Sequence, residues 1–150
     1  MQASAVTTSP PRPSLLVLDA APARRLALIG ALRDRFRVLP DDPSRTAIRR
    51  VRDSNPELVL ISVDPRNPKA ALSFCRALKT DLRPNAVAVL DPTGAVEADE
   101  VLAVAEGYAR GELTPERMVA WTEDVLAGRK PVEEGRISKR SMLKRLFRRG

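Results

Sequence analysis

The stretch LVLI at residues 58–61 decides the fold. It lies within PELVLISVDP (56–65), where Asn55 and Pro56 close the preceding segment and Ser62 follows the apolar run. A short, uninterrupted apolar run between turn-forming residues is typical of a strand buried on both faces. Such strands belong to parallel sheets covered by helices on both sides, so we expect an α/β domain.

Four further strand candidates surround this run, and a helical pattern follows each of the five strands. The other strands are LLVL (15–18), RVL (37–39), AVAVL (86–90) and GYAR (107–110). Helices begin at Pro22, at Asp42-Pro43, at Asn67-Pro68, at residue 97 and at Thr114-Pro115, the last ending at Gly128. The first has Leu26, Ile29, Leu32 and Phe36 at helical spacing. Right-handed crossovers then favour a flavodoxin-like (βα)5 doubly wound parallel sheet with strand order 2-1-3-4-5.

The charge of the chain is unevenly distributed. The net charge of the 150 residues is +7, yet all 19 acidic residues lie at or before Glu134. Seven basic residues and no acidic ones follow from Arg136 onward, so the basic character belongs to the tail. We expect a disordered leader at 1–13, a domain at 14–129, a linker at 130–135 and a basic amphipathic tail helix at 136–150.

Residue usage excludes several kinds of site. Cys75 is the single cysteine and the chain has no histidine, which excludes an internal disulfide and Ser-His or Cys-His catalytic pairs. No apolar run approaches the roughly 18 residues that a transmembrane helix needs, and the first residues do not form a secretory signal. We therefore expect a cytoplasmic protein.

Several segments together resemble the receiver domains of two-component response regulators over residues 14–128. The resemblance rests on LLVLDAAP, NPELVLISV, LSFCRALKTD and GYARGELTPERM, in that order and spacing. It implies the flavodoxin-like fold, a phosphate-accepting site at the carboxyl ends of the strands, and a signalling role.

The residues at that implied site depart from the receiver pattern. The magnesium-binding acidic pair corresponds to Asp19 and Ala20, and the phosphoacceptor aspartate to Ser62. The switch Ser/Thr corresponds to Asp91, and the phosphate-binding lysine to Gly111. Phosphoryl transfer needs a nucleophile, a divalent ion and a cation beside the phosphoryl oxygens. We therefore expect a pseudo-receiver with no enzymatic activity and no cofactor, in which Ser62 bonds to neighbouring backbone.

Three aspartates at the strand ends allow a second interpretation. Asp19, Asp64 and Asp91 could converge and bind magnesium or calcium through their carboxylates, which would make the protein a metal or small-ligand sensor. Alternatively, they are loop residues that cap nearby helices. We favour the second interpretation and assign no metal site.

A protein-binding surface is expected near the fifth strand and the last helix. Tyr108, Arg110 and Trp121 lie in these segments and are of the types enriched in binding hot spots. This face would bind a protein partner or form a homodimer. The alternative is that Trp121 belongs to the core and Arg110 to a solvated edge.

The tail RISKRSMLKRLFRRG (136–150) has the pattern of a basic amphipathic helix capped by Ser138. Its apolar stripe consists of Met142, Leu143, Leu146 and Phe147. Its basic residues are Arg136, Lys139, Arg140, Lys144, Arg145, Arg148 and Arg149. An acidic groove on a partner, an anionic membrane or nucleic acid could each receive it. We expect an adaptor that docks through this tail, with a DNA-associated regulator as the alternative.

Overall fold

The computed structural model describes residues 12–43, 45–81 and 86–137, which form one six-stranded parallel sheet in the order β2-β1-β3-β4-β5-β6. The strands are β1 (Ser14–Leu18), β2 (Arg37–Asp41), β3 (Leu58–Ser62), β4 (Val87–Asp91), β5 (Tyr108–Arg110) and β6 (Val132–Glu134). The predicted flavodoxin-like order 2-1-3-4-5 is confirmed, and β6 extends it by one strand.

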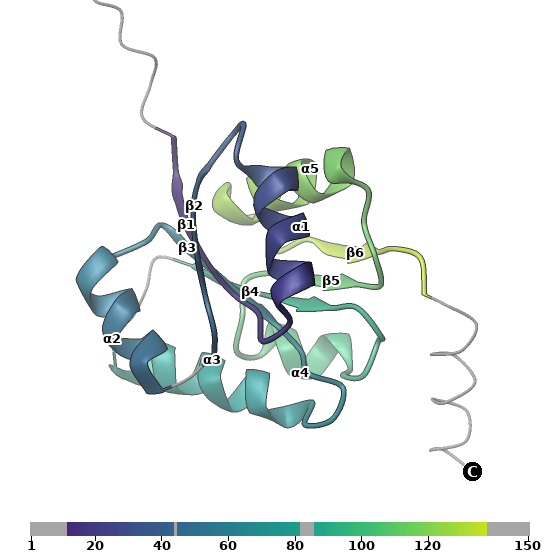
Figure 1. Ribbon diagram of the computed structural model, residues 1–150. Helices are drawn as coiled ribbons and strands as arrows, with labels where there is room; N and C mark the ends of the chain where they lie inside the picture. The colour runs from purple at the N-terminus through teal and green to yellow at the C-terminus, as the bar shows by residue number, and fades with distance from the viewer. Residues whose placement is uncertain (1–11, 44, 82–85, 138–150) are drawn as a thin grey trace, which may run out of the picture.

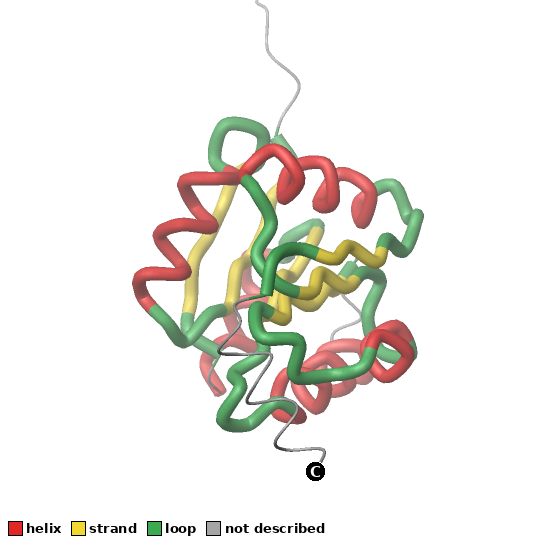
Figure 2. Tube along the Cα trace, turned by 90° about the vertical axis from the view of Figure 1, so that its right-hand side faces the viewer, coloured by secondary structure: helices red, strands yellow, loops and turns green. Residues whose placement is uncertain are grey.

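Helices cover both faces of this sheet. They are α1 (Pro22–Leu32), α2 (Arg45–Ser54), α3 (Lys69–Asp81), α4 (Ala98–Leu102) and α5 (Pro115–Leu126). Figure 1 shows α1 and α5 on one face and α2, α3 and α4 on the other. In the view of Figure 2, turned by 90°, the strands lie between the helices. This arrangement buries both sides of the central strands.

The apolar run 58–61 supplies both hydrophobic cores. Leu58 and Leu60 pack in the cluster under α1 and α5, whereas Val59 and Ile61 pack in the cluster under α2, α3 and α4. All five residues of β3 are buried. Because each side chain of β3 faces a helical layer, the sequence of this strand does not alternate between apolar and polar residues.

The last helix begins and ends as its sequence predicts. The Thr114 side chain accepts a hydrogen bond from the backbone N–H of Arg117, and Pro115 occupies the first turn. Gly128 follows the helix with a φ of 77°, the left-handed conformation that favours glycine.

The expected apolar face of α1 is partly wrong. Leu26 is 70% exposed, whereas Leu28 is buried. Phe36 is buried too, but it lies beyond the end of α1 at Leu32. The helix is therefore shorter than its apolar spacing suggested, and its buried residues are Leu28 and Leu32, of which only Leu32 belongs to the expected face.

The segment expected to be a linker at 130–135 contains the extra strand β6. Tyr108 pairs with Val132 and Arg110 with Glu134 in a parallel register. Arg117 of α5 donates through Nε to Glu133 at 2.9 Å, which joins the strand to the helix before it. The linker prediction failed because Val132-Glu133-Glu134 is a short edge strand with little apolar character.

Two predicted segments remain largely outside the described residues. The leader prediction falls on 1–13, of which 12 and 13 are described, and Pro13 accepts a hydrogen bond from the Arg37 N–H at 2.9 Å. The tail-helix prediction falls on 136–150, of which only 136 and 137 are described. None of the helices in the described ranges is long and apolar enough to cross a membrane.

Candidate functional site

The carboxyl ends of β1, β3, β4 and β5 form one edge of the sheet, as the parallel register requires. This edge carries Asp19, Ser62, Asp91 and Gly111, four of the five positions that correspond to the receiver site in the resemblance. The three polar side chains make different contacts, and Gly111 has no side chain.

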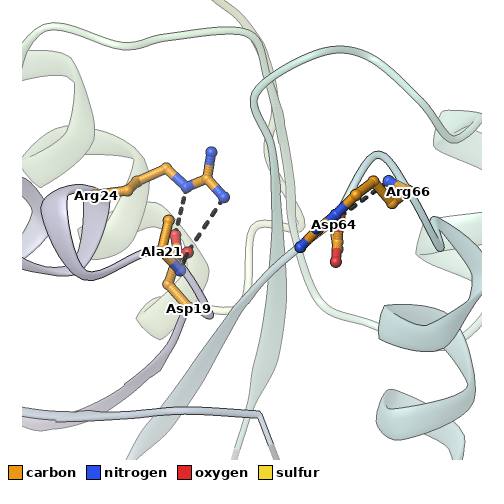
Figure 3. A network of polar contacts seen from close by, with 5 residues as sticks. All are labelled: Asp19, Ala21, Arg24, Asp64 and Arg66. Atoms are coloured by element: carbon orange, nitrogen blue, oxygen red, sulfur yellow. Dashed lines mark hydrogen bonds and ion pairs between the residues drawn. The ribbon is translucent and has the colours of Figure 1, made fainter.

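The Asp19 carboxylate is fully buried and is paired with an arginine of α1. Arg24 donates to it twice, from Nε to Oδ2 at 2.5 Å and from Nη2 to Oδ1 at 3.2 Å. The backbone N–H of Ala21 donates to Oδ1 at 2.8 Å. Figure 3 shows the guanidinium of Arg24 directed at the end of β1. The positive charge that a buried carboxylate requires is therefore supplied by a side chain.

Arg24 is a site residue that the sequence interpretation missed. It lies five residues after Asp19, in the first turn of α1, where a long side chain can reach back over the strand end. The signal was present as an aspartate, a proline and then an arginine over residues 19–24. Its neighbour Ala20, at the second acidic position of the resemblance, is exposed and supplies no ligand atom from its side chain.

Ser62 is buried without a hydrogen-bond partner for its hydroxyl. Its relative exposure is 7%, and its Oγ contacts no donor or acceptor among the described residues. The expectation that Ser62 bonds to neighbouring backbone is therefore wrong. The backbone there is satisfied without the hydroxyl, because the Val63 N–H donates to the Leu90 carbonyl at 2.7 Å.

Asp64 lies near this edge but in a separate turn. Its Oδ1 accepts a hydrogen bond from the backbone N–H of Arg66 at 2.9 Å, and its carbonyl accepts one from Asn67. The bond from the Arg66 N–H, with the nearby guanidinium, lowers the pKa of the Asp64 carboxyl. In Figure 3 the Asp64–Arg66 pair is separate from the Asp19–Arg24 pair, and no contact joins them.

The Asp91 carboxylate is fully buried and bonds to the loop after β4. It accepts hydrogen bonds from the backbone N–H groups of Ala95 at 2.9 Å and Val96 at 3.0 Å. The hydroxyl of Tyr108 donates to its Oδ2 at 2.6 Å. Burial, and then the adjacent Asp91, raise the pKa of the Tyr108 phenol, which keeps this donor protonated.

The structure does not bring the three aspartates together. Asp19 and Asp64 line one hollow of about 300 Å³, with Ser62 and Phe74, whereas Asp91 is not part of its lining. Within residues 12–43, 45–81 and 86–137, no group of three acidic, histidine or cysteine side chains could hold a metal ion. The alternative interpretation, in which Asp19, Asp64 and Asp91 converge, is therefore not supported by the described residues.

Gly111 lies where a side chain has no room. Its φ is 81°, and a Cβ placed on it would lie 2.8 Å from both the backbone carbon and the oxygen of Gly135. Real Cβ atoms do not approach backbone so closely, so a lysine at this position would displace the chain that follows β6. The absence of the phosphate-binding lysine and the presence of β6 are thus two aspects of one packing arrangement.

The predicted protein-binding surface is largely buried. Tyr108 is 1% exposed and Trp121 is 2% exposed, so neither ring is accessible to a partner. Arg110 is only partly exposed, and its Nε is buried without a partner in the described part of the chain. The prediction of an exposed surface is wrong for Tyr108 and Trp121, because both rings complete the hydrophobic cores on either side of the sheet.

Comparisons with known proteins identify the fold. No protein-family model and no curated protein matches this chain. Among solved structures, it is similar to a response regulator from Thermotoga maritima, with 22% identity, a TM-score of 0.66, and coverage of 77% of this chain and 98% of that one.

Two other solved structures give the same result. The signal receiver domain of the putative response regulator NarL from Mycobacterium tuberculosis is 18% identical, with a TM-score of 0.65 and coverage of 79% of this chain and 99% of that chain. A chemotaxis response regulator of Vibrio cholerae is 18% identical, with a TM-score of 0.65 and coverage of 76% and 98%. The chain therefore has the fold of response-regulator receiver domains.

Proposed function

We propose that this protein is a non-catalytic adaptor that uses a receiver fold without phosphorylation and binds a protein partner in a fixed conformation. The observation that carries this proposal is the pairing of buried Asp19 with Arg24. The guanidinium is bonded at 2.5 Å and 3.2 Å to the two carboxylate oxygens, so it already supplies the positive charge that a metal ion would bring to Asp19.

The surrounding residues support the loss of phosphoryl transfer. A serine hydroxyl needs a general base to become a nucleophile, and the Ser62 Oγ contacts no such group in the described residues. A phosphoryl group also needs a cation beside its oxygens, which Gly111 does not provide. Nucleophile, metal ligand and cation are thus altered at one strand edge.

The fixed conformation is supported by the Asp91–Tyr108 hydrogen bond. Both side chains are at most 1% exposed, and the carboxylate is held further by two backbone N–H groups. A Tyr108 ring that moved outward would take one donor away from the buried Asp91 carboxylate and leave it with the N–H groups of Ala95 and Val96, which is costly for a buried charge. The face around β5 therefore keeps one shape, whether or not phosphate is present.

The experiment is an attempt to phosphorylate the full chain with acetyl phosphate and magnesium, read by intact mass. A catalytically competent receiver domain serves as the positive control, and Ser62→Ala identifies the modified residue if an adduct forms. We expect no phosphoryl adduct under conditions that modify the control. A stoichiometric adduct that disappears in Ser62→Ala would refute the proposal.

A further inference from the structure

Two neighbouring hollows lie beside α1 and α5. One hollow of about 560 Å³ is lined by Ala27, Leu28, Leu113 and Met118, and it reaches the strand ends at Ser62 and Gly111. A second, of about 370 Å³, extends it past the end of α1, and the two share Ala31 and Pro115. We refer to both hollows together as the α1–α5 groove. Its walls are mostly small or apolar side chains, a surface that an apolar helix face can fill.

The chain leaves the described structure at the edge of this groove. Glu112 and Arg136 form an antiparallel bridge, with N–H to carbonyl distances of 2.9 Å and 3.0 Å in the two directions. Glu112 and Leu113 both line the groove. Residue 139 is therefore three positions beyond Arg136, which is hydrogen-bonded to the groove wall.

The length of the tail suits the groove. Residues 139–149 as an α-helix would span about 16 Å, the same length as the 11-residue helix α1 that forms one wall. Its sequence places Met142, Leu143, Leu146 and Phe147 on one face. Because an isolated helix of this length is marginal in water, it needs a surface that buries this stripe.

The charges of the groove suit the tail as well. Its lining contains four carboxylates, Asp34, Glu112, Glu116 and Glu123, and two arginines. Arg24 is paired with Asp19, and Arg35 lies 3.5 Å from Glu123. The tail is basic on both flanks of its apolar stripe, so the carboxylates of the groove would face opposite charge.

We propose that residues 139–149 bind the α1–α5 groove of their own chain as an amphipathic helix. The apolar stripe lies over Leu28, Leu113 and Met118, and the basic residues lie beside the carboxylates of the groove. Tethering at Arg136 gives the tail an effective concentration of about millimolar, so a weak contact suffices to keep it bound. This inference does not depend on the adaptor role. It implies that any partner of the α1–α5 face must displace the tail.

Hydrogen exchange by mass spectrometry on the full chain tests this proposal. We expect peptides covering 139–149 to exchange about tenfold more slowly than an unstructured chain, or more slowly still. Ala27→Arg places a bulky cation in the groove from an exposed position, and Phe147→Glu places a charge in the stripe. Both variants should abolish the protection. Leu26→Arg is the matched control, because Leu26 is 70% exposed on α1 and lines neither hollow, and it should preserve the protection.

Two further conditions distinguish this proposal from binding of the tail to a second copy of the chain or to a membrane. Protection that rises with protein concentration would assign the tail to a second copy and overturn the proposal. Protection that appears only with vesicles containing anionic lipid would assign it to a membrane and also overturn it. Exchange at unstructured rates in the wild-type chain, or protection that survives Ala27→Arg, would refute it directly.

Discussion

The replacement Arg24→Met tests whether a side chain balances the buried charge of Asp19. It removes two hydrogen bonds and the positive charge from a carboxylate with no solvent exposure, while keeping a side chain of similar length. Breaking one partner of a fully buried ion pair costs about 3–5 kcal/mol. Because the Arg24 side chain is 35% exposed, water screens part of this loss, and we expect about 2 kcal/mol.

The assay is urea unfolding of the full chain, followed by fluorescence of its single tryptophan, Trp121, which is 2% exposed. A loss of about 2 kcal/mol corresponds to a fall in Tm of about 8 °C for a domain of this size. Arg25→Met is the matched control on the same helix turn, and we expect it to change the free energy of unfolding by less than about 0.5 kcal/mol.

A double-mutant cycle separates lost charge balance from lost packing. If the cost comes from an unpaired buried carboxylate, Asp19→Asn should recover at least about 1 kcal/mol in the Arg24→Met background. If instead the effects of Arg24→Met and Asp19→Asn simply add, the two side chains are not coupled. The reasoning that the Arg24 guanidinium balances the buried charge of Asp19 would then be refuted.

Further predictions concern Tyr108, Gly111 and Cys75. Tyr108→Phe removes the hydroxyl that bonds to Asp91 and should destabilise the chain by about 2 kcal/mol in urea unfolding. Because the folded state raises the pKa of Tyr108, the free energy of unfolding of the wild type should fall as the pH rises above about 10, where the unfolded phenol ionises. The dependence of this free energy on pH should be weaker in Tyr108→Phe. Equal pH dependence in the two proteins would contradict the burial of a protonated Tyr108 phenol. Gly111→Ala should destabilise by about 3 kcal/mol, against about 1 kcal/mol for Gly128→Ala. Both glycines have positive φ, but only at Gly111 would the added Cβ meet other backbone atoms. Similar losses for the two variants would show that this steric overlap is unimportant. Cys75 is fully buried, and burial raises the pKa of its thiol to about 12. Thiol reagents at neutral pH should therefore label it only in urea. Rapid labelling in buffer would contradict its position in the core.

Most of the sheet could be predicted because its central strands are uninterrupted apolar runs. Residues 58–61 indicate a strand buried on both faces, and helix signals such as Thr114-Pro115 mark the crossovers that impose the order. Strand β6 could not be predicted in the same way, because it lies at an edge and two of its three residues are glutamates. Its stability comes from pairing with β5 and from Arg117, neither of which appears as a local pattern.

The candidate site was predictable in position but not in its contacts. The strand ends placed Asp19, Ser62, Asp91 and Gly111 on one edge, since parallel strands end together. The direction of each carboxylate depended on partners distant in the sequence, as the 17-residue separation of Asp91 and Tyr108 shows. The burial of Trp121 also depended on tertiary packing, and its residue type alone suggested a binding surface.

The measurement that tests the central claim most directly is an amide NMR titration of the full chain with magnesium and beryllofluoride, the phosphoryl mimic that activates a receiver domain of the same fold. If Arg24 balances the charge of Asp19 and Gly111 leaves the site without a cation for phosphate, the amide signals near Ser62 and Tyr108 should not move at concentrations that saturate a competent receiver domain. Saturable shifts of those signals would show that the site still binds a metal ion and a phosphoryl group, and would contradict the account.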